Sequence, residues 1–360
     1  MSTKNFPCTQ CGAKLEYAPG QLALVCPYCE TKNNIVDDAA DTQAAVAELS
    51  YQDYLAKQAA NEPTIEQQNV ECPGCGAHTL FAPNVVADRC QFCASPMSAK
   101  AAIAVRLIQP KAVAPFDITE TDARTRFKQW VKGLWFAPNA LQKAYRTEQG
   151  LKGIYIPYWT YDADTDTPYS GQRGVDYTET ETYVDNGETK TRQVTKTEWS
   201  FVSGQVNIAF DDVLAIASTT LPTDYAEKLE PWQLEKLQSY RDDYVSGFTV
   251  EAYQVGLAPG FEHARGKMED HIRAAICADI GGNHQRIINM QPHYANIRFK
   301  HILLPIWLSS YKYGAKTYRF LINGQSGEVQ GQRPYSVWKI SFAVLLGAIA
   351  LGVAIMFAQR

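Results

Sequence analysis

A chain of 360 residues exceeds what one hydrophobic core usually organises, so two or three modules are expected. With 46% hydrophobic and 20% charged residues, it has a globular composition, which excludes a collagen, a wholly disordered chain and a multi-span membrane protein. The formal net charge is −4, and the first hundred residues contain six Lys/Arg against eleven Asp/Glu, which disfavours phosphate binding there.

The N-terminal part of the chain is rich in paired cysteines. Eight of the nine cysteines form four C-x-x-C pairs, and only Cys277 stands alone. This pattern favours metal ligands over the disulfides of a small secreted domain. The polar start Met1–Pro7 leaves no room for a secretory signal, so we expect the thiols to stay in a reducing compartment.

The cysteine pairs belong to an internal repeat of one unit. Its ligand positions are Cys8, Cys11, Cys26 and Cys29 in the first copy and Cys72, Cys75, Cys90 and Cys93 in the second. Gly12 matches Gly76, and Tyr17 is matched by Phe81. Two residues between ligands let a tight turn aim both sulfurs at one ion, and the following glycine permits the required backbone geometry.

Each set offers four thiolates and no open position, which is the ligand set of structural zinc. The sequence therefore predicts two four-cysteine zinc ribbons, at residues 1–36 and 71–100, with one structural Zn²⁺ ion in each. Iron of the rubredoxin kind is the alternative. Residues 37–70 are a predicted linker with an amphipathic helix, whose apolar positions are Val46, Leu49, Tyr54 and Leu55.

Residues 101–336 are predicted to form an α+β domain, because cysteine pairs stop and aromatic, β-branched and turn residues dominate. Asp117 or Thr119 is expected to cap its first helix, which Pro138 ends. The apolar face of this helix comprises Phe127, Trp130, Val131 and Leu134.

A β-hairpin is predicted next in this domain. Thr178–Val184 and Arg192–Val202 alternate in the manner of half-exposed strands, and Asn186-Gly187 between them is a hairpin turn signal. The remaining predicted elements are helices at Tyr225–Tyr244 and Phe261–Ile280 and strands from Gln285 to Phe320.

A weaker repeat links two strand regions. Ile154–Trp159 resembles Ile302–Trp307, since both have a proline two positions before the tryptophan, and Gly171-Gln172-Arg173 resembles Gly331-Gln332-Arg333. We expect a duplicated β unit in which each Trp is a core anchor and each Pro lies at a strand edge or bulge. An aromatic cage at the two Trp residues is the alternative.

No catalytic motif is found. The chain has no G-x-S-x-G and no H-E-x-x-H, and Gly260–Lys267 misses the phosphate-loop spacing. Asp162, Asp164 and Asp166 alternate as in a calcium loop, but the required glycine and terminal glutamate are missing, so a solvated strand end or turn is expected. Cys277 beside an apolar stripe is interpreted as buried. The protein is therefore predicted not to be an enzyme, with a site assembled from dispersed residues of the middle domain as the alternative.

The C-terminal residues 337–360 are predicted to be a transmembrane segment. Ile340–Phe357 is almost uninterrupted in its apolar character and about 27 Å long at 1.5 Å per residue, close to the hydrocarbon thickness of a bilayer. Trp338-Lys339 and Gln359-Arg360 flank it as interfacial anchors. Ala343 with Gly347, and Ala348 with Gly352, are small-residue pairs that weakly indicate self-association. The bulk of the chain is then expected in the cytoplasm.

The chain resembles a family of bacterial membrane proteins with TFIIB-type double zinc ribbons, often labelled primosomal protein N′-like. The resemblance rests on the paired ribbons, the G-x-Y-I-P-Y-W-T-Y-D and G-Q-R-G segments, the P-I-W and N-G-Q-S-G-E-V segments, and the terminal helix. It implies PspA-type and flotillin-like SPFH membrane proteins as partners, and a role in envelope maintenance. The chain departs from any primosomal helicase because it has no nucleotide-binding loop.

These observations predict a non-enzymatic adaptor at the cytoplasmic membrane, in which zinc rigidifies two small surfaces that bind protein partners. Confinement by a single-pass anchor would raise the effective concentration of the binding surfaces. The alternative is a nucleic-acid-binding zinc-ribbon protein associated with replication or a helicase, for which the acidic N-terminal part is unsuited.

Overall fold

The computed structural model describes residues 6–35, 47–57, 64–81, 87–93, 95–138, 151–313, 316–332 and 335–358. One large mixed sheet organises these residues, with central strand order β12-β11-β16-β10-β13. Its strands are β4 (Leu49–Ser50), β10 (Ala112–Val113), β11 (Lys152–Asp185), β12 (Glu188–Ile216), β13 (Gln238–Ser239), β14 (Thr249–Val250), β15 (His284–Met290), β16 (His293–Tyr313), β17 (Lys316–Asn323) and β18 (Val329–Gly331).

The repeated strand motifs lie at the centre of the main sheet. Ile154–Trp159 on β11 pairs antiparallel with Ile302–Trp307 on β16, in a register that sets Ile156 opposite Leu304. Those two residues also correspond to each other in the repeat, so the pairing is symmetric about them. Long-range pairing therefore joins the two similar segments directly.

Both tryptophans of these motifs are buried. Trp159 is 0% and Trp307 5% exposed. Each indole Nε1–H donates to a backbone carbonyl, that of Val255 for Trp159 and that of Ile118 for Trp307, both at 2.9 Å. The core interpretation is confirmed, and with both rings enclosed these residues form no open aromatic cage.

The two prolines lie inside central strands rather than at the edge or bulge that the sequence led us to expect. Pro157 and Pro305 each stand one residue before the ladder to a third strand begins, which is β12 for the first and β17 for the second. Because the ladder to the third strand begins one residue later, the N–H that proline lacks is not needed for a hydrogen bond to that strand. Each proline carbonyl accepts a backbone N–H, from Ala217 at 3.0 Å and from Gly324 at 2.8 Å.

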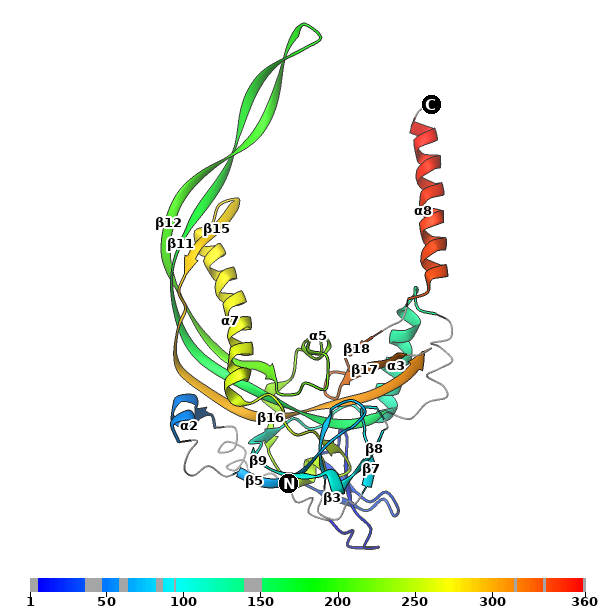
Figure 1. Ribbon diagram of the computed structural model, residues 1–360. Helices are drawn as coiled ribbons and strands as arrows, with labels where there is room; N and C mark the ends of the chain where they lie inside the picture. The colour runs from blue at the N-terminus through cyan, green and yellow to red at the C-terminus, as the bar shows by residue number, and fades with distance from the viewer. Residues whose placement is uncertain are drawn as a thin grey trace.

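Strands β11 and β12 are far longer than the predicted hairpin. They remain paired from Tyr158 and Ile216 out to Asp185 and Glu188, and the predicted turn Asn186-Gly187 joins them. Both turn residues have positive φ, 49° and 84°, as a two-residue hairpin turn requires. The result is a twisted two-stranded projection that extends well beyond the body of the molecule (Figure 1).

Two helices of the domain lie where the sequence predicts them, although α3 ends at Gly133 and not at Pro138. Helix α3 (Glu120–Gly133) is capped by Thr119, whose Oγ1 accepts the Asp122 N–H at 3.2 Å. Helix α7 (Leu257–Ile280) ends at Gly281, which has φ +66°. It packs along the base of β11 and β12 through an apolar stripe comprising Ile272, Ile276 and Ile280.

The predicted helix at Tyr225–Tyr244 is wrong. This segment holds the end of α5 (Thr223–Glu227), the 3₁₀ turn η2 (Leu234–Lys236), strand β13 and most of α6 (Asp242–Val245). Its apolar side chains Leu229, Trp232 and Leu237 are buried against the sheet without helical periodicity. Pro231 in the middle of the segment lacks the N–H that a continuous helix needs.

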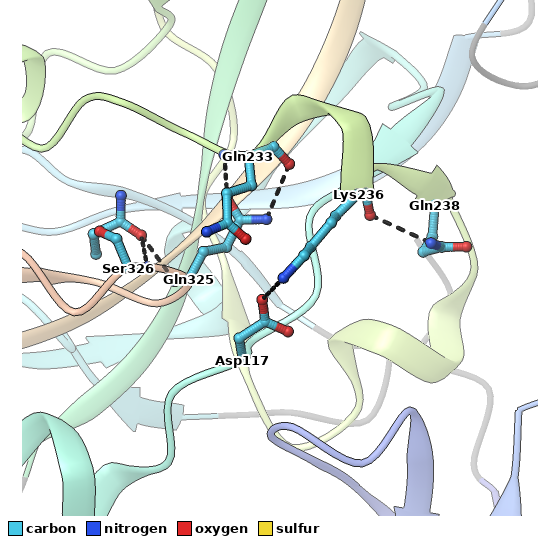
Figure 2. Close-up of polar contacts among 7 residues, drawn as sticks. Asp117, Gln233, Lys236, Gln238, Gln325 and Ser326 are labelled. Carbon is cyan, nitrogen blue, oxygen red and sulfur yellow. Dashed lines mark hydrogen bonds and ion pairs between the residues drawn. The ribbon is translucent and has the colours of Figure 1, made fainter.

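The N-G-Q-S-G-E-V segment forms the turn between β17 and β18 and docks η2 (Figure 2). The Asn323 side-chain oxygen accepts the backbone N–H groups of Gln325 and Ser326, at 2.8 and 3.0 Å. The Gln325 side chain in turn exchanges two hydrogen bonds with the backbone of Gln233. Lys236 Nζ lies 3.1 Å from an Asp117 carboxylate oxygen. The motif therefore has a structural role.

The cysteine-rich region forms small separate sheets. The first repeat copy contains β1 (Glu16–Ala18), β2 (Ala23–Val25) and β3 (Lys32–Asn34). Around the second copy are β5 (Thr64–Glu71), β6 (His78–Phe81), β7 (Ala87–Arg89), β8 (Pro96–Ser98), the turn η1 (Ala99–Ala101) and β9 (Ile103–Ile108). In Figure 1 these elements lie below the main sheet, whereas the β11–β12 projection and the C-terminal helix α8 (Val337–Ala358) extend above it.

The linker between the two repeat copies is only partly helical within the described residues. Helix α2 (Tyr51–Lys57) contains Tyr54 and Leu55, whereas Leu49 belongs to β4, which pairs with β16. Val46 lies outside the described residues. Tyr51 and Tyr54 contact aromatic side chains of the sheet and of α7, so the helix is docked on the domain.

Candidate metal centres

The structure brings the four cysteines of the first copy together. Their sulfurs form one group in which the potential ligand atoms lie within 4.8 Å of one another. Cys8 Sγ is 3.5 Å from Cys29 Sγ, and Cys11 Sγ is 3.5 Å from both Cys26 Sγ and Cys29 Sγ. Cys8 and Cys26 are buried, whereas the other two thiols face solvent.

The second copy reproduces this geometry. Cys72 Sγ lies 3.5 Å from Cys93 Sγ, and Cys75 Sγ lies 3.6 Å from Cys90 Sγ. All four again form one group within 4.8 Å. Cys72 and Cys90 are buried, and the other two are half-buried, so this cluster is the better shielded of the two.

Matching turns position the first cysteine pair of each cluster. The Gly12 N–H donates to Cys8 O and the Gly76 N–H to Cys72 O, both at 2.9 Å. These glycines have φ +74° and +73°, a region that residues with a Cβ rarely adopt. In the second turn of the first copy, Glu30 has φ +59° and its N–H donates to Cys26 O. The backbone conformation therefore favours glycine after each first pair, although Glu30 adopts a similar conformation in the second turn.

The distances fit a tetrahedral metal site and no disulfide. Sulfurs bonded to one zinc ion at about 2.3 Å would be about 3.8 Å apart, close to the 3.5–3.6 Å observed. A disulfide would hold two sulfurs at about 2.05 Å, and all of these cysteines are free thiols. Both clusters are therefore close enough to bind metal ions, and all-thiolate ligation is consistent with zinc.

Hydrogen bonds and burial shift the pKa values of the cysteine thiols in opposite directions. A side-chain hydrogen bond with Thr31, 3.1 Å away, lowers the pKa of Cys29 to about 6. Burial opposes a lower pKa at Cys93, yet its bonds with Ser95 lower that pKa to about 7. Burial raises the pKa of Cys75 to about 11 and also raises that of Cys90. A cation is needed for all four thiols to be thiolates together.

Each cluster is anchored to the main domain through its own small sheet. In the first copy, Tyr17 packs against Tyr244 with ring centroids 5.7 Å apart, and the Tyr17 N–H donates to Ser246 O at 3.0 Å. In the second copy, Thr79 on β6 forms a bridge with Glu251, and the Ala252 N–H donates to His78 O at 3.2 Å. The metal sites are thus coupled to the domain.

Histidine contributes no ligand atom to the second cluster. The ring Nδ1 of His78 lies 2.6 Å from the Asn69 amide nitrogen, and the candidate metal group near it contains cysteines alone. Cys277 on α7 is half-buried and lies apart from both clusters, in place of the fully buried position that the sequence predicted.

A third group of side chains escaped the sequence analysis. Carboxylate oxygens of Glu48, Asp162, Asp211 and Asp212 lie within 4.8 Å of one another. Asp162 is 3% exposed inside β11, so its interpretation as part of a solvated strand end or turn is wrong, whereas Asp164 and Asp166 are exposed on the same strand. The β-bulge at Asp162 and the pairing of distant segments bring together residues from three parts of the chain, which no local motif signals.

Two cations of the chain form ion pairs with this acidic group. Lys300 is 3% exposed, and its Nζ lies 3.1 Å from Glu48 and 2.7 Å from Asp212. Arg298 Nε lies 3.0 Å from Glu48. Burial and the neighbouring Glu48 carboxyl raise the pKa of Asp162 to about 7. The group is therefore an ion-pair network that fixes β4 to the sheet.

Helix α8 differs from the other described helices in having no buried face. Val337–Phe357 has a mean hydropathy of 2.6, and none of its most apolar window is buried. By length and composition this one helix could span a membrane. Trp338 is 87% exposed, and Lys339 Nζ donates to Ala137 O at 2.9 Å. Gln359-Arg360, the predicted anchors at the far end, lie outside the described residues.

Comparison with known proteins gives one relative and no assigned activity. No family model and no solved structure matches the chain. The chain is similar to "Uncharacterized protein YdjG" of Bacillus subtilis (strain 168), with 26% identity over 235 residues. The match covers 65% of this chain and 66% of the relative, slightly less than two thirds of that protein's length.

Proposed function

We propose that the protein is a non-enzymatic adaptor tethered to the cytoplasmic membrane by α8, with two zinc-stabilised modules that bind protein partners. The observation that carries this proposal is the combination of two four-cysteine clusters with an apolar helix of membrane length that packs no core. Neither cluster offers the open coordination position of catalytic zinc. The N-terminal bulk of the chain would be cytoplasmic, where thiols stay reduced.

Zinc would stiffen surfaces that have little core of their own. The strands of the first module are three residues long, and few side chains pack between them. In units of this size metal binding supplies much of the folding free energy, on the order of 10 kcal/mol or more at neutral pH. A module fixed in this way presents a preorganised binding surface, which reduces the entropy cost of association.

In Figure 1 both modules lie on the opposite side of the main sheet from α8. The β11–β12 projection extends in the same direction as α8 and carries charged residues to its tip. Such strands with unpaired edges cannot enter hydrocarbon. Insertion of α8 therefore requires it to turn relative to the body, breaking the contact of Lys339 with Ala137.

The partners that we propose are PspA-type and flotillin-like SPFH membrane proteins, and the process is envelope maintenance. Support comes from the sequence resemblance to membrane-anchored TFIIB-type double zinc-ribbon proteins. The register of Ile154–Trp159 against Ile302–Trp307 supports a further proposal, that the main domain arose by duplication of a β unit. Two equal segments paired symmetrically about Ile156 and Leu304 are the arrangement that a duplicated unit would give.

Affinity capture tests the adaptor proposal. The full-length chain would be captured from gently solubilised membranes beside a Cys8→Ser, Cys72→Ser double variant, with Cys277→Ser as a matched control. Wild type and control should carry two zinc ions per chain and recover the same partner. The double variant should lose the zinc ions and should also fail to recover the partner. Full partner recovery without zinc would contradict docking through the modules. Flotation with vesicles, expected for the full chain and lost after deletion of residues 337–360, tests the anchor independently.

A further inference from the structure

The turn that follows helix α3, residues 134–137, exposes two large aromatic side chains and is here called the aromatic turn. Trp135 is 83% and Phe136 42% exposed, whereas Leu134 and Ala137 on either side of them pack against the core of the domain. Two backbone hydrogen bonds of 3.1 Å shape the turn, from Leu134 N–H to Val131 O and from Ala137 N–H to Leu134 O. The turn therefore holds both rings outside the core.

The aromatic turn is bonded to the start of α8, and the two lie side by side in Figure 1. The Ser336 N–H donates to Phe136 O at 2.7 Å, and Lys339 Nζ donates to Ala137 O at 2.9 Å. The second contact is lost when α8 turns for insertion. The first precedes Val337, the first residue of α8, so it does not require the helix to keep its direction.

The length of α8 leaves no slack between the body and a bilayer. Val337–Phe357 comprises 21 residues, which is about 32 Å at 1.5 Å per residue. The hydrocarbon core of a bilayer is about 30 Å thick, so a spanning α8 would use nearly its whole length inside it. Ser336 would then lie among the lipid headgroups, a layer of about 5–7 Å on each side. The aromatic turn, one hydrogen bond away, would lie at the same level.

The exposed rings have the chemistry of a membrane interface. Tryptophan is enriched there because its ring is apolar while its N–H finds a partner among headgroups and water. Trp338 in the first turn of α8 is 87% exposed, and Trp135 beside it is similarly open. Large apolar side chains that gather on a surface mark an interaction site. At this position the surface that meets them is the lipid.

The charges around the aromatic turn are all positive in the sequence segments that form it. Residues 127–138 and 335–358 contain Lys128, Lys132 and Lys339 and no acidic residue. Lys128 and Lys132 are exposed on α3. Lysines next to a transmembrane helix are attracted to anionic headgroups. Aromatic rings combined with lysines therefore match an anionic lipid surface.

We propose that the aromatic turn is a second membrane contact, in which Trp135 and Phe136 enter the headgroup layer beside the start of α8 while Lys128 and Lys132 face anionic headgroups. A single helix leaves the body free to tilt about the point where the chain enters the bilayer. A second contact next to that point would restrict the tilt. The inference rests on the proposed anchoring by α8 and deepens it by assigning the part of the body that touches lipid.

Photocrosslinking to lipid tests the contact in the full-length chain, reconstituted in vesicles of phosphatidylcholine and phosphatidylglycerol. p-Benzoylphenylalanine would replace Trp135 or, as the matched control, Ile103, which is 68% exposed on β9 in the cysteine-rich region. Position 135 should give about tenfold more phospholipid adduct than position 103. Equal yields, no lipid adduct from position 135 in chains that float with the vesicles, or a link from position 135 to protein in place of lipid would overturn the proposal.

Fluorescence quenching separates this proposal from the anchor itself. Phospholipids brominated in the upper part of their acyl chains quench tryptophans that lie at the interface. Trp338→Phe and Trp135→Phe should each reduce the quenching by a similar amount, and Trp232→Phe, which removes a buried ring, should leave it unchanged. An effect of Trp338→Phe alone would overturn the second contact and leave the anchor standing. An effect of neither variant would overturn both.

Discussion

The two four-cysteine modules and the main sheet are stabilised in different ways. Each module has strands of a few residues and gathers its turns around four sulfurs. The main sheet instead buries large side chains completely, among them Trp159, Tyr155 and Tyr161. A unit too small for its own core depends on a bound ion, whereas the long strands derive their stability from apolar burial. The two regions should therefore respond to different perturbations.

Metal removal is expected to have the largest effect, and mainly on the modules. A chelator, or Cys26→Ser with Cys90→Ser, removes a buried ligand or the ion itself, and metal binding of this kind is worth on the order of 10 kcal/mol. Hydrogen exchange should then lose protection in residues 6–35 and 64–81. It should keep most of the protection in β11 and β16, because these strands pair with each other over a long ladder, although the buried cysteines of both clusters pack against their core. Modules that stay protected without metal would refute this dependence.

Truncation of a core anchor should give the reverse pattern. Trp159→Ala removes a fully buried ring and its hydrogen bond to Val255, which should cost the main sheet about 3–5 kcal/mol of unfolding free energy. Trp135→Ala is the matched control, because Trp135 is 83% exposed and should have little effect. Denaturant midpoints measure both. Equal zinc content in the two variants would show that the modules do not depend on the core anchor.

This difference also explains what could be predicted from the sequence. The ligand sets, the cap of α3, the Asn186-Gly187 turn and the apolar α8 all depend on neighbours a few residues apart. A short stretch of sequence is therefore enough to predict each of these features. The eight cysteines were grouped correctly because their spacing is fixed by the turn that positions them.

Features that depend on distant pairing were missed. The alternation in Thr178–Val184 marks a strand but sets no limit on its length, and β11 continues over 34 residues because β12 and β16 pair with it. The spacing of apolar residues in Tyr225–Tyr244 is typical of a helix. In the structure these side chains instead pack against the sheet from a segment that is not one continuous helix. The Asp162 network combines side chains from β11, β12, β16 and Glu48, the residue before β4, and a single sequence contains no signal for this combination.

The junction between the second module and the main sheet should respond to pH. Glu251 is 2% exposed beside Thr79, and burial raises its pKa to about 7 from 4.5. The folded state thus holds the proton more tightly than the unfolded state. The stabilising contribution is complete below about pH 4.5 and is lost as pH rises through about 7, on the order of 3 kcal/mol in all.

Glu251→Gln should remove this pH dependence, because the amide cannot ionise while its oxygen can still accept from Ser218. Urea midpoints at pH 5 and pH 8 would measure the change, with the exposed Glu235→Gln as control. The wild type and the control should lose stability between the two pH values, and the variant should lose less, because Asp162, whose pKa is also raised to about 7, still ionises in this range. A variant that keeps the wild-type slope would assign the pH dependence to other groups.

The smallest expected effect comes from replacing the turn glycines of the modules. This test distinguishes the cost of the backbone conformation from the cost of steric crowding. Gly12 and Gly76 both have φ near +74°, and an added Cβ at either would meet no atom within 4 Å. Substitution by alanine should therefore cost only the left-handed backbone penalty, about 1–2 kcal/mol. That corresponds to roughly a tenfold weaker zinc affinity in each copy, measurable by chelator competition. Gly133→Ala in α3 also meets open space, but without positive φ, and should leave zinc affinity unchanged. If all three variants bound zinc as the wild type does, the turn glycines would not be needed for conformation, and the matched positions in the two copies would have no physical explanation.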